Sequence, residues 1–203
     1  MICTQNPGHI DYAITGGIGM GKSAAAEWLK NHGIPVIDSD DLARDAVKPG
    51  EPGLQKLVDH FGEGILCLDG TLDRPSVAKI VFQDTAARKF LEQTLHPLIR
   101  ERWLQWKQQC EKEGEAVCVV IIPLLFETGM ESDFDAVICL TTTPEIQRQR
   151  LLKRGMCEED IRRRIMNQWP IEEKIRRSQF VVDNNGTPQE MAKQLEKIFF
   201  KQD

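Results

Sequence analysis

Residues 16–23 have the types and the spacing of a phosphate-binding loop. They read Gly-Gly-Ile-Gly-Met-Gly-Lys-Ser and match the pattern G-x-x-x-x-G-K-[ST]. In such a loop the backbone N–H groups surround phosphate oxygens, the lysine reaches the β- and γ-phosphates, and the final hydroxyl is a ligand of Mg²⁺. The pattern therefore predicts that the chain binds ATP or a similar nucleotide. The residues predicted to contact nucleotide are Gly16, Gly17, Ile18, Gly19, Met20, Gly21, Lys22, Ser23 and Ala24, and Ser23 is the predicted Mg²⁺ ligand.

Two aspartates follow the next apolar segment, Val36-Ile37, at positions 38 and 40. Ligands of open α/β sheets bind beyond the carboxyl ends of the strands, so Asp38 is a candidate to accept the proton of a substrate hydroxyl. The alternative is structural: Ser39 or Asp40 caps a helix that begins near Leu42. Both hold if Asp40 caps the helix while Asp38 faces the substrate.

The chain lacks two motifs of other nucleotide-binding proteins. Its most apolar segment ends Ile121-Ile122-Pro123 without the aspartate of a hydrolytic ATPase, and no Asn-Lys-x-Asp base-recognition motif is present. These absences favour a kinase of small molecules, in which Lys22, Mg²⁺ and mobile arginines neutralise the phosphate charge.

The arginines of residues 147–154 are candidates for that role. Arg150 and Arg154 lie one helical turn apart, and the segment up to residue 170 could form a lid that closes over ATP. The alternative is a solvated basic surface paired with the acidic residues 158–160. The loop at residues 183–186 could likewise touch adenine through its backbone, with Asn185 as a nucleotide contact, or could be a simple Asn-Gly turn.

Composition is that of an ordinary globular protein, with 203 residues, 41% hydrophobic and 28% charged. We expect one domain, or one domain with a small insertion. The net charge of −5 argues against general binding of nucleic acid. Residues 144–177, however, carry ten Lys and Arg against six Asp and Glu, which favours a local site for a polyanion.

No apolar run approaches the length of a membrane span, and residues 1–11 lack the basic and apolar regions of a signal peptide. The cysteines show no C-x-x-C pair and the histidines no metal-ligand spacing. We therefore expect reduced thiols in a cytoplasmic protein, with Cys118 and Cys139 as plain core residues. The six cysteines stand at positions 3, 67, 110, 118, 139 and 157.

The elements that must position these residues alternate between short strands and longer helices, which predicts a parallel α/β sheet. The expected strands are 12–15, 35–37, 117–122, 136–140 and 180–182. The expected helices are 22–31, 42–47, 53–61, 76–81, 85–113, 144–153, 158–168 and 188–199. Pro97 lies inside the longest helix and should bend or break it.

Taken together, these motifs resemble those of the dephospho-CoA kinase family. The similar segments, in the family's order, are residues 15–23, 36–40 (Val-Ile-Asp-Ser-Asp) with Ala43 and Arg44, 95–100 (Leu-His-Pro-Leu-Ile-Arg), 122–127 (Ile-Pro-Leu-Leu-Phe-Glu), 147–154 with Gln147, Arg148, Leu151 and Arg154, then Gln168, and 182–186 (Val-Asp-Asn-Asn-Gly). They cover nearly the whole chain, so the resemblance is far more specific than the loop alone.

The resemblance implies a reaction in which ATP phosphorylates the 3′-hydroxyl of dephospho-CoA, giving CoA and ADP in the last step of CoA biosynthesis. It implies a P-loop kinase fold with a parallel five-stranded sheet, a helical CoA-binding region at about 41–113 and a lid at about 145–170, all within one domain, 1–203. By matching position, Asp38 would be the catalytic base, Lys22 and Ser23 would serve the phosphates and Mg²⁺, and Arg148 and Arg154 would contact phosphate from the lid.

One departure concerns nucleotide affinity. The family commonly has Thr after the loop serine, where this chain has Ala24, so one hydroxyl contact to phosphate is expected to be missing. Two other functions remain open: another small-molecule or nucleoside monophosphate kinase, and a nucleotide-regulated binding module. The expected partners are dephospho-CoA and ATP, with no nucleic acid and no membrane; the oligomeric state is open, and a monomer is compatible with the sequence.

Overall fold

The computed structural model of the chain describes residues 8–200. Within it the chain divides into two compact units, Met1–Ile37 with Gln109–Asp203, and Asp38–Gln108. Cys3, which we expected to be a reduced thiol, lies outside the described residues. Most of residues 1–11, in which we looked for a signal peptide, also lie outside them. The second unit covers most of the helical region predicted at 41–113, and the prediction of one kinase domain over 1–203 stays a prediction.

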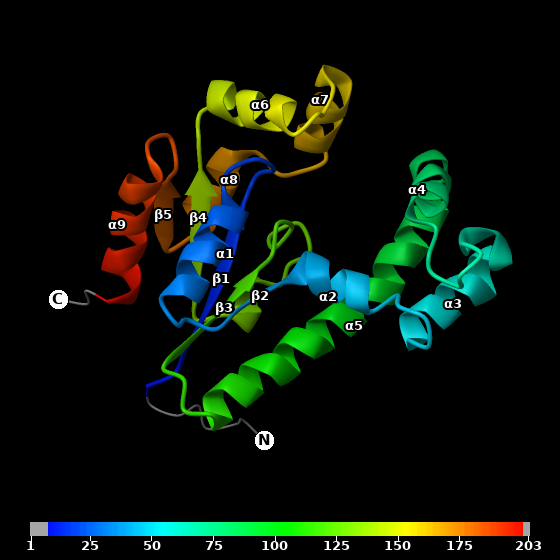
Figure 1. The fold of residues 1–203 in the computed structure, drawn as a ribbon, viewed down its shortest axis with the longest axis horizontal. Helices are drawn as coiled ribbons and strands as arrows, with labels where there is room; N and C mark the ends of the chain where they lie inside the picture. The colour runs from blue at the N-terminus through cyan, green and yellow to red at the C-terminus, as the bar shows by residue number, and fades with distance from the viewer. Residues whose placement is uncertain (1–7, 201–203) are drawn as a thin grey trace. The chain divides into compact units, whose positions relative to one another are not determined.

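A parallel sheet organises the first unit and confirms the predicted fold class (Figure 1). Among residues 8–200 it has five strands in the order β2-β3-β1-β4-β5. The central strand β1 pairs in parallel with β3 and β4, and β4 pairs in parallel with β5. The strands are β1 (Ile10–Gly16), β2 (Val36–Asp38), β3 (Val117–Ile121), β4 (Ala136–Thr141) and β5 (Phe180–Asp183).

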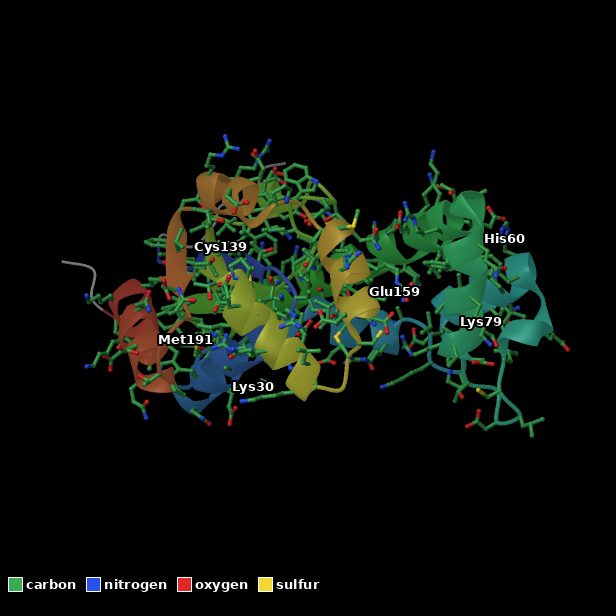
Figure 2. All side chains as sticks on the ribbon, turned by 90° about the horizontal axis from the view of Figure 1, so that it is seen from above. Lys30, His60, Lys79, Cys139, Glu159 and Met191 are labelled. Carbon is green, nitrogen blue, oxygen red and sulfur yellow. The ribbon has the colours of Figure 1, made fainter. Side chains whose placement is uncertain are left out.

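Helices cover both faces of the sheet, which explains why β3 is an unbroken apolar run. On one face, Ile14 of β1 packs in a core with Leu29 of α1 and Leu195 of α9. The other face of the sheet is covered as well. Burial of Cys139 of β4 raises the pKa of its thiol to about 11, and the charge of Lys174 of α8 lowers that pKa. Figure 2 shows α8 on the side of the sheet opposite to α1 and α9. The helices of this unit are α1 (Lys22–Asn31), α6 (Pro144–Lys153), α7 (Glu158–Met166), α8 (Ile171–Arg177) and α9 (Pro188–Phe199), with a 3₁₀ turn at Glu131–Asp133.

Local sequence explains where most of these helices begin. The Thr143 hydroxyl accepts from the N–H of Ile146 at the start of α6, and Thr187 forms a capping box with Glu190 at the start of α9. Both helices have a proline in their first turn, where its missing N–H costs no hydrogen bond. The predictions of α6 and α9 are confirmed at both ends. Helix α8 was not predicted, because its short, charged sequence has little apolar periodicity.

The second unit is helical and has its own core. Its helices are α2 (Ser39–Asp45), α3 (Pro52–Phe61), α4 (Arg74–Gln83) and most of α5 (Thr85–Lys112), with a 3₁₀ turn at Glu63–Ile65. Leu57 and Ile65 are buried with Val77 in this core. Gly53 allows α3 to approach α2, because a Cβ there would lie 2.2 Å from the carbonyl oxygen of Ala46.

We expected Pro97 to bend or break helix α5; the helix continues through Pro97, so it is not broken there. A single missing N–H removes one of many hydrogen bonds in a 28-residue helix. Neither α5 nor any other helix within residues 8–200 combines the length and apolarity needed to cross a membrane.

Candidate active site

The phosphate-binding loop joins the end of β1 to the start of α1, as the sequence predicts. Its conformation requires glycine at two positions because other backbone and side-chain atoms approach closely. At Gly16 (φ +141°), a Cβ would lie 2.4 Å from the carbonyl oxygen of Leu140. At Gly21 (φ +105°), a Cβ would lie 1.9 Å from Nδ2 of Asn184. The loop is therefore a tightly surrounded backbone turn, and no side chain larger than hydrogen fits at either position.

Lys22 folds its ammonium over the loop. Its Nζ donates to the carbonyl oxygens of Gly16 at 2.8 Å and Gly17 at 2.9 Å. The N–H of Gly17 donates to Sδ of Met20 at 3.1 Å, and both residues are buried. These contacts hold a positive charge beside the backbone N–H groups that a phosphate would use.

Ser23 and Ala24 lie in the first turn of α1 and are exposed. The N-terminus of a helix favours anions, since its first N–H groups lack partners within the helix. A hydroxyl oxygen at this point is a hard donor of the kind that Mg²⁺ prefers, so Ser23 fits the role of metal ligand. Ala24 offers only a methyl group at the corresponding position.

A cavity of about 360 Å³ lies against the loop, entirely within the first unit. Its wall has one part from the loop and α1, one from the basic end of α6, and one from the β5–α9 connection. The lining residues are Gly19, Gly21, Ala24, Arg150, Lys153, Arg154, Asn184, Gly186, Pro188 and Met191. Figure 2 labels Met191 on α9. Three cations therefore line a cavity that also reaches the phosphate-binding backbone, an arrangement suited to a polyanion.

Arg150 is the most constrained cation of this cavity. Its Nη2 donates to the backbone oxygen of Asn184 at 2.9 Å. Its Nη1 is buried and finds no hydrogen-bond partner among the described residues. A buried guanidinium nitrogen that lacks a partner is costly, so this geometry favours an anionic ligand at Nη1.

Arg148, a predicted catalytic residue, lies elsewhere on α6. It is exposed and forms an ion pair with Glu158 of α7, with Nε 3.0 Å from Oε2. The hydrogen bond to Glu158 raises the pKa of Arg148, and the hydrogen bond from Arg148 lowers the pKa of Glu158. This is the surface pairing that we considered as the alternative. Arg154, by contrast, lines the cavity as a nucleotide contact would.

The β5–α9 connection holds the loop through Asn184. Its buried side chain donates from Nδ2 to the Met20 carbonyl at 3.0 Å. The neighbouring Asn185, the predicted contact, instead accepts at Oδ1 from the Thr143 N–H at 2.7 Å and the Thr142 hydroxyl at 2.9 Å. Asn185 thus fixes the start of α6, and Asn184 is the residue of this pair that lines the cavity.

Two glutamines of the predicted lid form hydrogen bonds with the backbone of Ile18. Gln147 of α6 donates from Nε2 to the Ile18 carbonyl at 2.7 Å. Gln168, after α7, accepts at Oε1 from the Ile18 N–H at 2.9 Å. The segment predicted as a lid is therefore hydrogen-bonded directly to the phosphate-binding loop.

A buried ion pair anchors the far end of the same segment. The Nζ of Lys174, which is fully buried, lies 2.8 Å from Oε1 of Glu127 and donates to the Pro123 carbonyl at 2.7 Å. The same Glu127 oxygen accepts from the N–H of Trp169 at 2.8 Å. Glu127 therefore joins the segment after β3 to α8, a contact that the sequence pattern did not reveal.

Asp38 ends β2 and belongs to the second unit. Its Oδ1 accepts from the N–H of Asp40 at 2.8 Å, so Asp38 is the N-cap of α2, which begins at Ser39. The expectation that Ser39 or Asp40 caps a helix beginning near Leu42 is therefore wrong. Aspartate is a strong N-cap residue, and two aspartates in the first turn, Asp40 and Asp41, add a favourable interaction with the helix dipole.

Five of the residues above were missed as site residues: Gln147, Asn184, Gln168, Lys174 and Glu127. Gln147, Gln168 and Glu127 stood only among the segments that carry the family resemblance. Asn184 stood beside the residue that we chose, and neighbouring asparagines in one loop cannot be told apart without knowing which one faces inward. Lys174 sits in a charged segment typical of a solvated surface, and nothing local indicates its burial.

Comparison with known proteins agrees with this geometry. A sequence model described as dephospho-CoA kinase matches residues 12–190. The dephospho-CoA kinase of Geobacillus kaustophilus is 42% identical over 183 residues, which are 90% of this chain and 91% of the relative. A solved structure of the dephospho-CoA kinase from Campylobacter jejuni has a TM-score of 0.70 at 30% identity, covering 93% of this chain and 96% of that one. The crystal structure of TT1252 from Thermus thermophilus has a TM-score of 0.80 at 32% identity, covering 94% and 95%. The chain belongs to the dephospho-CoA kinase family.

Proposed function

We propose that this protein transfers the γ-phosphate of ATP to the 3′-hydroxyl of dephospho-CoA, giving CoA and ADP in the last step of CoA biosynthesis. The observation that carries this proposal is the cavity against the phosphate-binding loop, with its basic wall of Arg150, Lys153 and Arg154. Membership of the family supplies the identity of the acceptor. The related kinases match over nine-tenths or more of this chain and of their own length.

The loop is proposed to bind the phosphates of ATP. Backbone N–H groups of residues 17–21 and the first turn of α1 would contact phosphate oxygens. Lys22 already lies over the loop and would place its charge beside the β- and γ-phosphates, where negative charge must be stabilised during transfer. Ser23 would hold Mg²⁺ through its hydroxyl oxygen, and this ion supplies charge neutralisation when bound.

Asp38 is proposed as the base that accepts the proton of the acceptor hydroxyl. Support comes from its place at the carboxyl end of β2 and from the family resemblance. Capping uses one of its two carboxylate oxygens for the Asp40 N–H, and a carboxylate has further lone pairs. Capping therefore also fixes the rotamer of the proposed base.

Arginines from the lid segment are proposed to contact the transferred phosphate and its neighbours. Arg154 and Arg150 are proposed nucleotide contacts because both line the cavity. Arg148 stays a proposed catalytic residue, and it would have to leave Glu158 to reach a phosphate. An exposed ion pair is weak because water screens it, so such an exchange is physically reasonable.

The test is a product assay. The protein is incubated with ATP, Mg²⁺ and dephospho-CoA, and CoA is measured by mass spectrometry, with AMP as the alternative acceptor. Formation of CoA together with ADP supports the proposal. Phosphorylation of AMP alone would favour a nucleoside monophosphate kinase, and ATP binding with no product from either acceptor would favour a nucleotide-regulated binding module. The cytoplasmic location stays a prediction.

A further inference from the structure

A cluster of potential metal ligands lies at the amino ends of strands β1 and β3, whereas the loop follows the carboxyl end of β1. His9 precedes β1, Asp11 is the second residue of β1, and Cys118 is the second residue of β3. One ligand atom from each of the three side chains lies within 4.8 Å of the other two. Asp11 precedes Gly16 by five residues, so the cluster is roughly 16 Å from the phosphate-binding loop along the strand.

Strand register brings these residues together. Asp11 pairs directly with Cys118 across the parallel ladder, so their side chains project from the same face. The Sγ of Cys118 lies 3.0 Å from Oδ1 of Asp11. The Nε2 of His9 lies 2.9 Å from the same oxygen. Linear spacing did not indicate a site, because more than a hundred residues separate Cys118 from the other two.

His9 is oriented as a metal-ligating histidine usually is. Its Nδ1 lies 2.6 Å from the backbone oxygen of Glu115. A carbonyl only accepts hydrogen bonds, so Nδ1 carries the proton and Nε2 faces Asp11 and Cys118. In metal sites the second ring nitrogen commonly donates to a backbone carbonyl or a carboxylate, which fixes the tautomer and the ring plane.

The aspartate is fixed as well. The N–H of Asp11 donates to Oδ2 of Asp135 at 2.8 Å, and the Asp135 N–H donates to the Asp11 carbonyl at 3.0 Å. The side chains of His9 and Asp11 are only 7% and 10% exposed, and Cys118 is fully buried. The cluster is therefore a rigid, largely dry group of one nitrogen, one oxygen and one sulfur donor.

A second thiol stands beside the cluster. Cys110, near the end of α5, is buried, but its sulfur is not among the ligand atoms that lie within 4.8 Å of one another. It belongs to the same compact unit as the other three residues. The cluster therefore offers three protein ligands, and a water molecule would complete a four-coordinate zinc site.

We propose that His9, Asp11 and Cys118 bind a Zn²⁺ ion. Zinc accepts this mixture of nitrogen, oxygen and thiolate donors in tetrahedral geometry. Donor atoms of such a site lie about 3.3–3.7 Å apart. The observed separations of 2.9 Å and 3.0 Å therefore need to open by only a few tenths of an ångström. The ion replaces the direct contacts of Asp11 with His9 and Cys118, and it ties the start of β1 to β3.

Co²⁺ is the probe for this site, because thiolate ligation gives an intense charge-transfer absorption that oxygen ligands do not. Metal-free, reduced protein without nucleotide is titrated with Co²⁺ and then with Zn²⁺. We expect saturation at one equivalent with a thiolate band, displacement of Co²⁺ by Zn²⁺, and a higher melting temperature with Zn²⁺. Cys118→Ser should abolish the band, and His9→Gln should weaken Zn²⁺ binding more than 100-fold, since even loss of an outer-shell partner costs 10–100-fold.

The chain provides matched controls in its other thiols. Cys67 and Cys157 are exposed free cysteines, and Cys67→Ser and Cys157→Ser should leave the band unchanged. Cys110→Ser should leave the band unchanged, because Cys118 supplies the thiolate of the proposed site. If Cys118→Ser does not fold, His9→Gln and Asp11→Asn carry the same test. Absence of a thiolate band in the wild type, or its loss in a surface-cysteine variant, would overturn the proposal and leave His9 and Asp11 as a buried ion pair.

Discussion

The backbone N–H of Ile18 donates a hydrogen bond of 2.9 Å to the side-chain oxygen of Gln168. This bond joins the phosphate-binding loop to a residue 150 positions later in the chain. In phosphate-binding loops such N–H groups contact phosphate oxygens. A phosphate that takes this donor must therefore displace the Gln168 oxygen, so nucleotide binding and the position of the lid segment are expected to be coupled.

Exchange of backbone hydrogens tests that coupling. Gln168→Ala removes the acceptor, so residues 145–170 should exchange faster in the ATP-free variant than in the ATP-free wild type. With ATP and dephospho-CoA bound, both proteins should be protected in this segment, because the closed lid then contacts ligand. Gln149→Ala, an exposed glutamine on α6, is the control and should match the wild type. Equal exchange in the presence and absence of ligands would show that residues 145–170 are not a lid.

Arg150 should matter more for ATP binding than its neighbours on the helix surface. Arg150→Ala removes a guanidinium that lines the cavity and has a buried, unpartnered Nη1. Hydrogen bonds to charged groups are worth about 1.5–3 kcal/mol, so ATP affinity should fall about 10- to 150-fold in calorimetric titration. Arg163→Ala, an exposed arginine paired with Asp160, is the control. A larger loss in Arg148→Ala than in Arg150→Ala would mean that Arg148 leaves Glu158 and binds the nucleotide.

Asp38→Asn separates the two roles of this side chain. Asparagine caps a helix about as well as aspartate, so α2 and the free energy of unfolding should be preserved. The charge that receives the proton is lost, and a positioned base is worth about 10²- to 10⁴-fold, so kcat should fall by that factor. ATP affinity should change little, because the loop is untouched.

Asp40→Asn is the matched control for Asp38→Asn. Asp40 supplies a backbone N–H to the cap and lies exposed in the first turn of α2. Its variant should keep kcat within a few-fold. An inactive Asp40→Asn beside an active Asp38→Asn would reverse the assignment of the two carboxylates, and equal losses would indicate that the pair organises Mg²⁺.

Gly21→Ala should damage the loop far more than a glycine substitution elsewhere. At Gly21 the new methyl group would lie 1.9 Å from Nδ2 of Asn184, in addition to the cost of φ +105°. At Gly33 the backbone has φ +72° but nothing lies within 4 Å of the added Cβ. Gly33→Ala should cost only about 1–2 kcal/mol of unfolding free energy. Gly21→Ala should lower the free energy of unfolding by more than Gly33→Ala does, and it should also abolish ATP binding. Equal losses of unfolding free energy in the two variants, measured by urea unfolding, would show that Asn184 moves aside freely.

Removal of the buried cation should strongly destabilise the first unit. Lys174→Met leaves Glu127 without the ammonium 2.8 Å from its oxygen, which should cost about 3–5 kcal/mol in urea unfolding. Adding Glu127→Gln should recover part of this loss, since the uncompensated charge is then removed. Arg176→Met, which breaks an exposed pair with Glu173, should change stability by about 0.5 kcal/mol or less. A small loss of unfolding free energy in Lys174→Met would mean that water reaches Glu127 readily.

The sequence by itself determined the phosphate-binding loop, its flanking strand and helix, and the α/β class. These features are local: glycine spacing, a short apolar strand, and an alanine-rich helix lie within about twenty consecutive residues. Helices α1, α6 and α9 were predicted at both ends, because each begins at a local signal that the structure retains: the loop glycine for α1, and Thr-Pro caps for α6 and α9.

Only the tertiary structure decided which polar side chain of each segment faces the site. Asn184 rather than Asn185 holds the loop, across 164 positions of sequence. Arg150 rather than Arg148 shares the cavity with Arg154. Lys174, in a segment that reads as a charged surface, is fully buried against Glu127. The physical reason is the same in each case. Local patterns determine backbone conformation, but hydrogen-bond partners are chosen by the register of strands and the packing of helices, which bring distant residues within 3 Å of one another.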